Sequence, residues 1–367
     1  MIIYITQDGD SLFSISERFG LPTGEIIEAN GLGTHPFLAA GQPLLLPTNN
    51  GLKTENISKE QIQVIVNADL DGFRADGFIK KNGGLISFLC PSGYIIASDG
   101  SIEAQGDQSV LDKLHEHKVS LMLHIDCGEL STARLLHDDD LQRTLIKNIL
   151  RQIKERGFSG LKIGSGISSL DPPAVVRFFR NIMRILQPLK IHVTAELDMR
   201  DWYGRQSLET MGNIIDAVIL KTYGKNQSDY PCPPAPFGVI DEILQNAVGM
   251  IPPEKIFIGL PVYGQCWELP YTPGTGRGTI IGGDAAVTIA ARSGAKIEYD
   301  EESETPYINY SDENNNRHTI WFEDIRSIYF KLRLAEKYKL GGVCLDMREY
   351  DAPPLWKLID CGYNVIK

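Results

Sequence analysis

The sequence predicts an α/β protein: a (β/α)8 TIM barrel with a small α+β insertion, preceded by a small βααβ module. Three observations lead to this fold class. Residues 61–367 alternate eight apolar, strand-like segments with helical ones, which is the order of elements in a barrel of parallel strands. A polar stretch over residues 49–60 reads as a linker after residues 1–48. A β-rich excursion over residues 265–321 lengthens the barrel beyond the usual ~250 residues.

The first module, residues 1–48, has the signals of a strand, two helices and a closing strand. A helix is predicted to begin after an N-cap at Asp10 or Ser11 and to end at Gly20. A second amphipathic helix is predicted from Thr23 to Asn30, before the short apolar strand in "GQPLLLP". A unit of this size has little core, so nearly every apolar residue must lie inside.

The segments "IYITQDGDSLFSISERFG", "IIEANGL" and "GQPLLLP" are similar to the LysM pattern over its whole length. The resemblance implies a shallow groove that binds N-acetylglucosamine units of peptidoglycan or chitin. Simple turn and cap chemistry is the alternative role for Gly9 and Asn30, and backbone groups in such loops can serve both purposes. The loops after the first strand and after the second helix would form the groove, with Gly9, Asp10, Ser11, Asn30, Gly31 and Leu32.

The predicted barrel strands are apolar runs separated by helical segments such as "LQRTLIKNILRQIKERG" and "PAVVRFFRNIMRILQ". In chain order they are "IQVIVNA", "GLISFLCP", "VSLMLHID", "GLKIGSGI", "IHVTAELD", "AVILKTY", "KIFIGLPVYG" and "GGVCLDMR".

Three later segments, "LPVYGQCWELPY", "IEYDEESETPYINY" and "WFEDIRSIYFKL", resemble the family 18 glycoside hydrolases. The most similar subgroup is the LysM-bearing spore-cortex N-acetylglucosaminidases of spore-forming bacteria. Such enzymes carry D-x-x-D-x-D-x-E on the fourth barrel strand. The final Glu is the general acid, and the preceding Asp orients the acetamido group of the substrate, whose oxygen is the internal nucleophile.

The stretch that matches this motif is "GFSGLKIGSG", in which the four acidic positions are Ser159, Lys162, Gly164 and Gly166. A glycine at the position of the proton donor cannot transfer a proton. A shift of one residue does not restore the motif, because no Asp or Glu occurs between positions 155 and 171. The sequence therefore predicts a barrel that has lost hydrolase activity.

Two further pocket positions depart from the family pattern. The sixth-strand motif M-x-Y-[D/E] reads "KTYG", so Lys221 replaces Met and Gly224 replaces the acid, while Tyr223 is retained. On the last strand, Asp346 stands where the family presents a Trp beneath the reacting sugar. Loss of that indole removes a large contact surface.

Charged residues are predicted at inward-facing positions instead. On the fifth strand, alternation places His192, Thr194, Glu196 and Asp198 on one face. Their predicted neighbours on other strands are Asp126, Lys162, Lys221, Tyr223, Asp346 and Arg348.

Two interpretations remain open for these charges. In the first interpretation they form an interior ion-pair network, because buried charges must be paired. Glu196 would then enter the volume that Gly164 and Gly166 leave. Alternatively they form a repurposed site, with Glu196 or Asp198 as an acid, or with Lys221 as a base or nucleophile.

Weaker motifs have simpler explanations. "HEH" (115–117) and "HDDD" (137–140) contain metal-ligand types, but a solvated helix and a helix cap at Asp138 explain them. Neither a metal nor a cofactor is predicted. Trp267 is a candidate sugar platform, as are Tyr271 and Trp321, although packing of the insertion also explains all three. The six scattered cysteines are expected to be buried, reduced thiols.

The net charge of −11 argues against a nucleic-acid ligand. No apolar run approaches the ~20 residues of a membrane span, and the first residues lack the pattern of a signal peptide, so we expect none. The favoured hypothesis is a spore coat or cortex component that is deposited from the mother-cell cytoplasm and binds peptidoglycan or a related glycan without cleaving it. The alternatives are a diverged or repurposed barrel enzyme and a non-catalytic, protein-binding scaffold.

Overall fold

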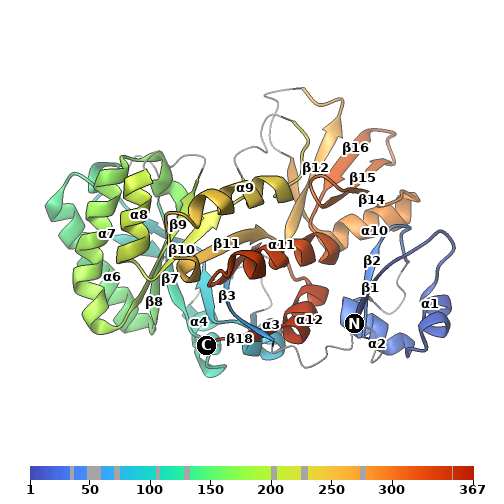
Figure 1. The fold of residues 1–367 in the computed structure, drawn as a ribbon, viewed down its shortest axis with the longest axis horizontal. Helices are drawn as coiled ribbons and strands as arrows, with labels where there is room; N and C mark the ends of the chain where they lie inside the picture. The colour runs from blue at the N-terminus through green and yellow to red at the C-terminus, as the bar shows by residue number, and fades with distance from the viewer. Residues whose placement is uncertain are drawn as a thin grey trace.

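The structure, a computed structural model, forms a barrel with a small β-rich insertion on one side and the N-terminal module beside it (Figure 1). The predicted fold class is confirmed. The residues described are 1–33, 37–47, 59–69, 75–104, 108–127, 133–199, 205–224, 230–272, 278–348 and 350–367.

Eight parallel strands form the barrel wall. Neighbouring strands pair in order around the ring, and a bridge between Leu89 and Leu121 closes it. The strands are β3 (Glu60–Ala68), β4 (Phe88–Pro91), β7 (Met122–Asp126), β8 (Gly160–Ile163), β9 (His192–Asp198), β10 (Ala217–Lys221), β11 (Ile256–Pro261) and β17 (Gly342–Arg348).

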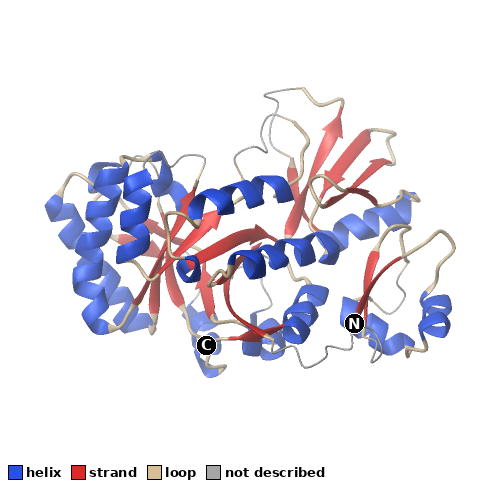
Figure 2. Cartoon of the chain, in the orientation of Figure 1, coloured by secondary structure: helices blue, strands red, loops and turns tan. Residues whose placement is uncertain are grey.

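Helices cover the outside of this wall (Figure 2). They are α3 (Ala75–Asn82), α4 (Gln108–Glu116), α6 (Asp139–Arg156), α7 (Pro172–Leu186), α8 (Arg205–Ile214), α9 (Phe237–Ala247), α11 (Ile325–Tyr338) and α12 (Pro353–Gly362). Shorter elements complete the barrel: the hairpin β5 (Tyr94–Ile96) and β6 (Ile102–Ala104), the strand β18 (Tyr363–Val365), and the 3-10 turns η1 (Gly83–Leu85), η2 (Ser165–Ser169), η3 (Gln187–Leu189) and η5 (Pro253–Lys255).

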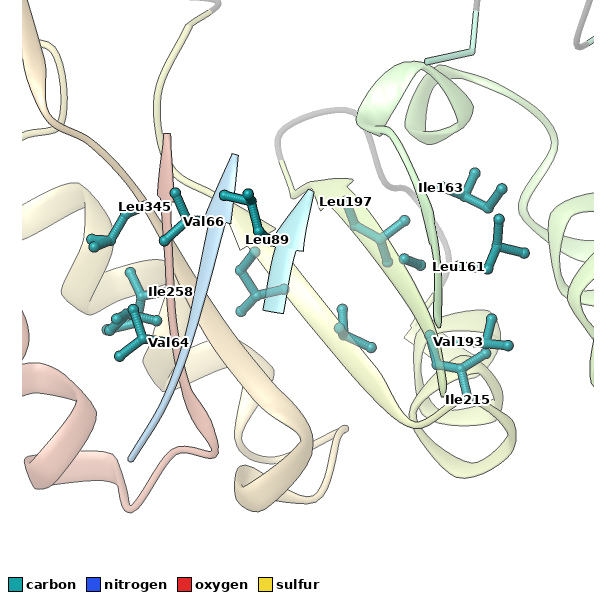
Figure 3. Close-up of a cluster of buried hydrophobic side chains, with 14 of the residues drawn as sticks. Val64, Val66, Leu89, Leu161, Ile163, Val193, Leu197, Ile215, Ile258 and Leu345 are labelled. Atoms are coloured by element: carbon teal, nitrogen blue, oxygen red, sulfur yellow. The ribbon is translucent and has the colours of Figure 1, made fainter. Parts of the chain in front are cut away.

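Strand alternation divides the barrel core into two layers. Residues such as Val64, Leu161 and Val193 point outward and pack beneath the helices in the large apolar cluster (Figure 3). A smaller apolar cluster is formed by residues in alternation with these along the strands, including Ile65, Phe257 and Cys344. This period-two pattern places Lys162, Thr194 and Glu196 with the inner layer.

The N-terminal module is the predicted βααβ unit. Its elements are β1 (Ile2–Ile5), α1 (Leu12–Phe19), α2 (Thr23–Asn30) and β2 (Pro43–Leu46), with β1 and β2 paired antiparallel. Ser11 caps α1 in a capping box with Ser14, and Gly20 ends the helix in a left-handed conformation.

The insertion lies between β11 and β17. Its five-stranded antiparallel sheet has the order β13-β12-β16-β15-β14, with one helix packed on it. The elements are β12 (Tyr263–Leu269), β13 (Thr279–Gly282), α10 (Gly283–Ser293), β14 (Glu298–Asp300), β15 (Thr305–Ser311) and β16 (Arg317–Trp321).

The module is packed against both other parts of the chain. Leu45 of β2 belongs to the large barrel cluster, whereas Ala39 belongs to the insertion cluster around Ile297. The backbone N–H of Ile297 donates to the carbonyl of Ala40 at 2.8 Å, and Gly31 lies against Pro353 of α12. Figure 1 shows α2 and β2 beside α12 and α10.

Several sequence predictions differ from the structure in extent, and two of them concern the candidate site and the domain boundary. The predicted fourth strand runs through Ile167, but β8 ends at Ile163 and a 3-10 turn follows. The predicted linker reaches residue 60, but Glu60 already belongs to β3, while residues 48–58 lie outside the described part. Within the described ranges, the helices are too short or too polar to cross a bilayer.

Candidate functional site

Ion pairs join the inner layer near the carboxyl ends of β7, β8, β9 and β10. Lys162 lies in register between His124 of β7 and Thr194 of β9. Its Nζ is 2.5 Å from Glu196 Oε2 and 3.2 Å from His124 Nε2. Lys221 Nζ is 3.7 Å from Glu196 Oε1. We call His124, Lys162, Glu196 and Lys221 the barrel network.

Exposure divides the network. The side chain of Lys162 is fully buried and that of Glu196 nearly so, whereas the Lys221 side chain is 26% exposed. Lys221 also donates to Ser165 Oγ at 3.2 Å and lies 5.2 Å from the ring centre of Tyr223. The buried half of the network is an ion pair, and Lys221 is its accessible end.

The charges within the network stabilise one another. Burial alone raises the pKa of Glu196, but the ammonium groups of Lys162 and Lys221 outweigh it and lower that pKa to about 2. Burial lowers the pKa of Lys162, and Glu196 reverses this to a net increase. Burial, reinforced by Lys162, lowers the pKa of His124 to about 3. At neutral pH, Glu196 is therefore ionised, Lys162 is charged and His124 is neutral.

Asp346 belongs to a separate cluster at the end of β17. Its Oδ2 accepts from Tyr263 Oη at 2.9 Å and lies 3.9 Å from Arg348 Nε. The Arg348 guanidinium lies over the Tyr263 ring, 5.0 Å from its centre. Burial is the main reason that the pKa of Asp346 is raised. The carboxylate therefore lies between a phenol and a guanidinium.

The sequence suggested that the glycines after β8 leave volume for the Glu196 side chain. The structure contradicts this prediction. A Cβ on Gly166 would lie 1.9 Å from the carbonyl oxygen of Cys127. A Cβ on Gly164 would lie 3.0 Å from Asp126 Oδ1 and 3.4 Å from His124 Nε2. The backbone of Cys127 thus takes the space where a side chain at position 166 would begin.

The other candidate residues of the barrel have structural contacts. Ser159 Oγ donates to the carbonyl of Leu121 at 3.1 Å. Asp198 is buried, and its backbone N–H donates to Ser168 Oγ at 2.8 Å. Tyr223 is buried too, which raises the pKa of its phenol. Trp267 is 2% exposed and packs edge-on against Tyr271, with ring centres 5.2 Å apart.

Sequence reasoning missed His124, Ser165 and Tyr263 as parts of these clusters. His124 had a usable signal, because it lies two residues before the inward candidate Asp126 on the same strand. The two side chains are neighbours, with His124 Nε2 3.4 Å from Asp126 Oδ1. Ser165 had no such signal, because it follows the strand in the 3-10 turn η2.

Residues of the two weaker motifs make structural contacts. His115 Nε2 lies 2.8 Å from the carbonyl of Arg156, and Asp138 caps α6 by accepting from two backbone N–H groups.

Of the cysteines, Cys90 and Cys344 are buried, but Cys361 is exposed. The expectation of uniformly buried thiols is therefore wrong at Cys361, because α12 turns that position toward solvent.

In the first predicted loop of the module, side chains mostly stabilise the loop itself. Asp10 Oδ2 accepts from Tyr4 Oη at 2.5 Å and from the N–H of Gln7 at 2.8 Å. Ser11 caps α1. Gly9 has a left-handed conformation and open space on its Cβ side.

In the second predicted loop, the Asn30 side chain is buried and fully engaged. It donates to the carbonyls of Ile26 and Leu45 and accepts from the Leu45 N–H at 2.7 Å. Gly31 follows in a left-handed conformation. The surface that this loop presents therefore consists of the backbone at Gly31 and the residues after it, including Leu32.

Comparisons with known proteins match both parts of the chain. The sequence model "Glycosyl hydrolases family 18" matches residues 85–351, and the LysM domain model matches residues 4–47. A cortical fragment-lytic enzyme of Bacillus anthracis is 26% identical over 430 residues, covering 100% of this chain and 99% of the relative.

Solved structures agree on the fold. The spore cortex-lytic enzyme SleL of Bacillus megaterium superposes with a TM-score of 0.90 at 24% identity, covering 100% of this chain and 98% of the other. A chitinase from Chromobacterium violaceum gives 0.71 at 20% identity, over 82% and 98% of the two chains.

Proposed function

Since the chain belongs to the family 18 glycosyl hydrolases and carries a LysM domain, we propose that it binds an N-acetylglucosamine-containing glycan such as peptidoglycan without hydrolysing it. The observation that carries this proposal is the backbone contact at Gly166. A side chain at the proton-donor position would start 1.9 Å from the Cys127 carbonyl oxygen. The acid is absent, and the backbone around its position is also closed.

Glu196 is a poor replacement for the missing acid. A general acid must hold its proton near the working pH, whereas the lysines lower the pKa of Glu196 to about 2. Its carboxylate is also nearly buried and lies 2.5 Å from the Lys162 ammonium. These contacts favour the interpretation of the inward charges as an ion-pair network.

Hydrolysis assays test the loss of activity. Purified protein is incubated with spore-cortex fragments and with N-acetylglucosamine oligomers, and new reducing ends are counted. The B. anthracis relative, which bears the name of a lytic enzyme, is the positive control. We expect turnover at the level of the no-enzyme blank, because general acid catalysis alone is worth ~10²–10⁴-fold. Turnover that Glu196→Gln abolishes would show that the acid has moved.

Co-sedimentation tests the binding half of the proposal. We expect the full chain to sediment with insoluble peptidoglycan or chitin, and to do so at high salt, because a chain of net charge −11 gains little from charge attraction to an anionic wall. Protein that remains in the supernatant with both polymers would contradict it.

The names of the relatives, a cortical fragment-lytic enzyme and a spore cortex-lytic enzyme of Bacillus species, support a spore location. We propose deposition on the spore from the mother-cell cytoplasm. Mass spectrometry of native spore material is expected to find the chain with its N-terminal module complete. A cleaved module, or absence from spores, would count against this route.

A second candidate function rests on Lys221. Its ammonium is the accessible end of the barrel network and lies beside Ser165 and Tyr223. A repurposed enzyme would use this lysine as a base or nucleophile. Borohydride trapping with a panel of carbonyl compounds, compared between wild type and Lys221→Met, would reveal a lysine adduct if the amine is the nucleophile.

A further inference from the structure

A cavity of about 570 Å³ lies between the LysM domain and the insertion. We call it the interdomain pocket. Its size falls within the ~300–1,000 Å³ of typical small-molecule sites. One wall is the LysM segment that follows α2, and the facing wall is helix α10 of the insertion. The first turns of α11 and α12 form the remaining boundary.

Of the residues that the structure describes, the LysM wall comprises Asn30, Gly31, Leu32, Gly33, Phe37, Gln42 and Pro43. Gly31 lies against the ring of Pro353, where even a Cβ would approach to 2.5 Å, so this loop is fixed to the barrel. Gly33 has open space on its Cβ side. Phe37 completes the wall and is 80% exposed. An exposed aromatic ring beside the open space at Gly33 is a surface that suits the C–H face of a sugar.

The facing wall is one side of α10. Its pocket-lining residues follow helical spacing: Asp284, Val287, Thr288, Ala291 and Arg292. The opposite side of the helix, through Ala286 and Ala290, is buried in the insertion cluster. Ala39 of the LysM domain belongs to that same cluster. The two walls therefore share one apolar core, which holds them at a fixed separation.

The charge of the pocket favours an uncharged ligand. Glu323 is paired with Lys331 at 2.5 Å, and Asp324 with Arg326 at 2.9 Å. Asp351 accepts from Trp356 Nε1 and the N–H of Ala352. The remaining charged side chains of the lining are Asp284 and Arg292. Carboxylates in the lining repel an anionic polymer, but they accept hydrogen bonds well from sugar hydroxyl groups.

We infer that the interdomain pocket binds a neutral N-acetylhexosamine unit, and that α10 is the second wall of the LysM glycan site. The acetamido methyl and the C–H face of the ring contact Phe37, Val287 and Ala291. Hydroxyl and amide groups bond to the LysM backbone, Thr288 and Arg292. This inference rests on the proposed glycan-binding function. It adds that the LysM domain binds its ligand as part of the assembled chain.

Matched substitutions on α10 test the inference. Thr288 is exposed and lines the pocket, whereas Ala285 is exposed on the same helix outside it. The full chain is titrated with the N-acetylglucosamine pentamer by calorimetry. We expect Thr288→Trp, which fills the pocket, to weaken binding about tenfold or more. Ala285→Trp is expected to bind as wild type does. Arg292→Ala removes a pocket donor without adding bulk and is expected to weaken binding by a smaller factor, about threefold.

Each result decides a different point. Wild-type affinity in both Thr288→Trp and Arg292→Ala overturns the composite site and leaves the LysM domain as the whole binding unit. Equal losses in Thr288→Trp and Ala285→Trp also overturn it, because the loss then follows the helix and not the pocket. A wild-type chain that binds neither the pentamer nor insoluble glycan overturns the proposed function itself.

Discussion

The barrel mouth and the interdomain pocket differ in the exposure of their polar side chains. In the barrel, Lys162 and Glu196 are buried and satisfy each other at 2.5 Å. Between the LysM domain and α10, Phe37, Thr288 and Arg292 are exposed around a cavity of about 570 Å³. Carboxyl ends of barrel strands are the usual place for catalytic groups. In this chain that place holds the buried Lys162–Glu196 ion pair, whereas the open cavity lies where two domains meet.

The barrel network and the proposed glycan-binding pocket are therefore separate regions of the molecule. Gly164 and Gly166, which we align with two of the family's acids, belong to the barrel alone. The LysM loop and α10 are held by their own contacts with Pro353 and Ala39, which do not involve the barrel network. Variants in one region should therefore leave the other unchanged.

Lys162→Met is expected to have the largest effect on stability. It strands the buried Glu196 carboxylate, and breaking such a pair costs ~3–5 kcal/mol. Thermal unfolding should shift downward by about 4 °C or more. The double variant Lys162→Met/Glu196→Leu removes both charges and should recover most of the loss. A Tm within a degree of wild type for the single variant would mean that Glu196 is not held by Lys162.

Gly166→Ala comes next. Its Cβ would meet the Cys127 carbonyl oxygen at 1.9 Å, and overpacking of this kind costs ~1–3 kcal/mol. Gly164→Ala is the matched control, since its closest contact is the end of the exposed Asp126 side chain at 3.0 Å. Chemical denaturation should rank Gly166→Ala well below Gly164→Ala. Gly166→Glu should likewise fail to restore hydrolysis, and any restored turnover would refute the closed-backbone argument.

Acid is expected to destabilise the barrel in two stages. His124 has a folded pKa of about 3 against 6.5 when unfolded. The unfolded chain thus binds the proton first, and stability is lost as pH falls below about 6.5. The pKa of Glu196 falls from 4.5 to about 2, so its contribution is present above 4.5 and is lost as pH falls toward 2.

The first stage can be isolated by comparison with His124→Gln. Each pH unit is worth at most ~1.4 kcal/mol per group, which gives about 2 kcal/mol between pH 6.5 and 5. Unfolding free energies of wild type and His124→Gln should converge as pH falls through this window. Parallel curves for the two proteins would show that His124 does not titrate as a buried, neutral group.

Lys221→Met is expected to have the smallest effect. Its ammonium is 3.7 Å from Glu196 Oε1 and partly exposed, and such pairs are worth about 0–1 kcal/mol. Lys162 continues to neutralise Glu196 in this variant. A Tm change of more than about 4 °C would mean that the two lysines share the carboxylate equally. Glycan binding in the interdomain pocket should be unchanged.

The sequence by itself determined the architecture and the absence of carboxylates at four positions of the barrel. Eight apolar runs separated by helical segments specify a parallel barrel. Positions 159, 162, 164 and 166 lack carboxylates in any fold of this sequence. Alternation along β9 also placed Thr194 and Glu196 on one face, because side chains two apart on a strand point the same way.

The tertiary structure decided which charges meet. Alternation fixes the face of a strand, but not the stagger between strands or the rotamers of long side chains. Glu196 pairs at 2.5 Å with Lys162 and more loosely with Lys221, while Asp346 instead contacts Tyr263 and Arg348. The Cys127 carbonyl beside Gly166 and the LysM loop beside α10 join segments far apart in the chain. Such contacts depend on how separate elements pack, which no local pattern of residues encodes.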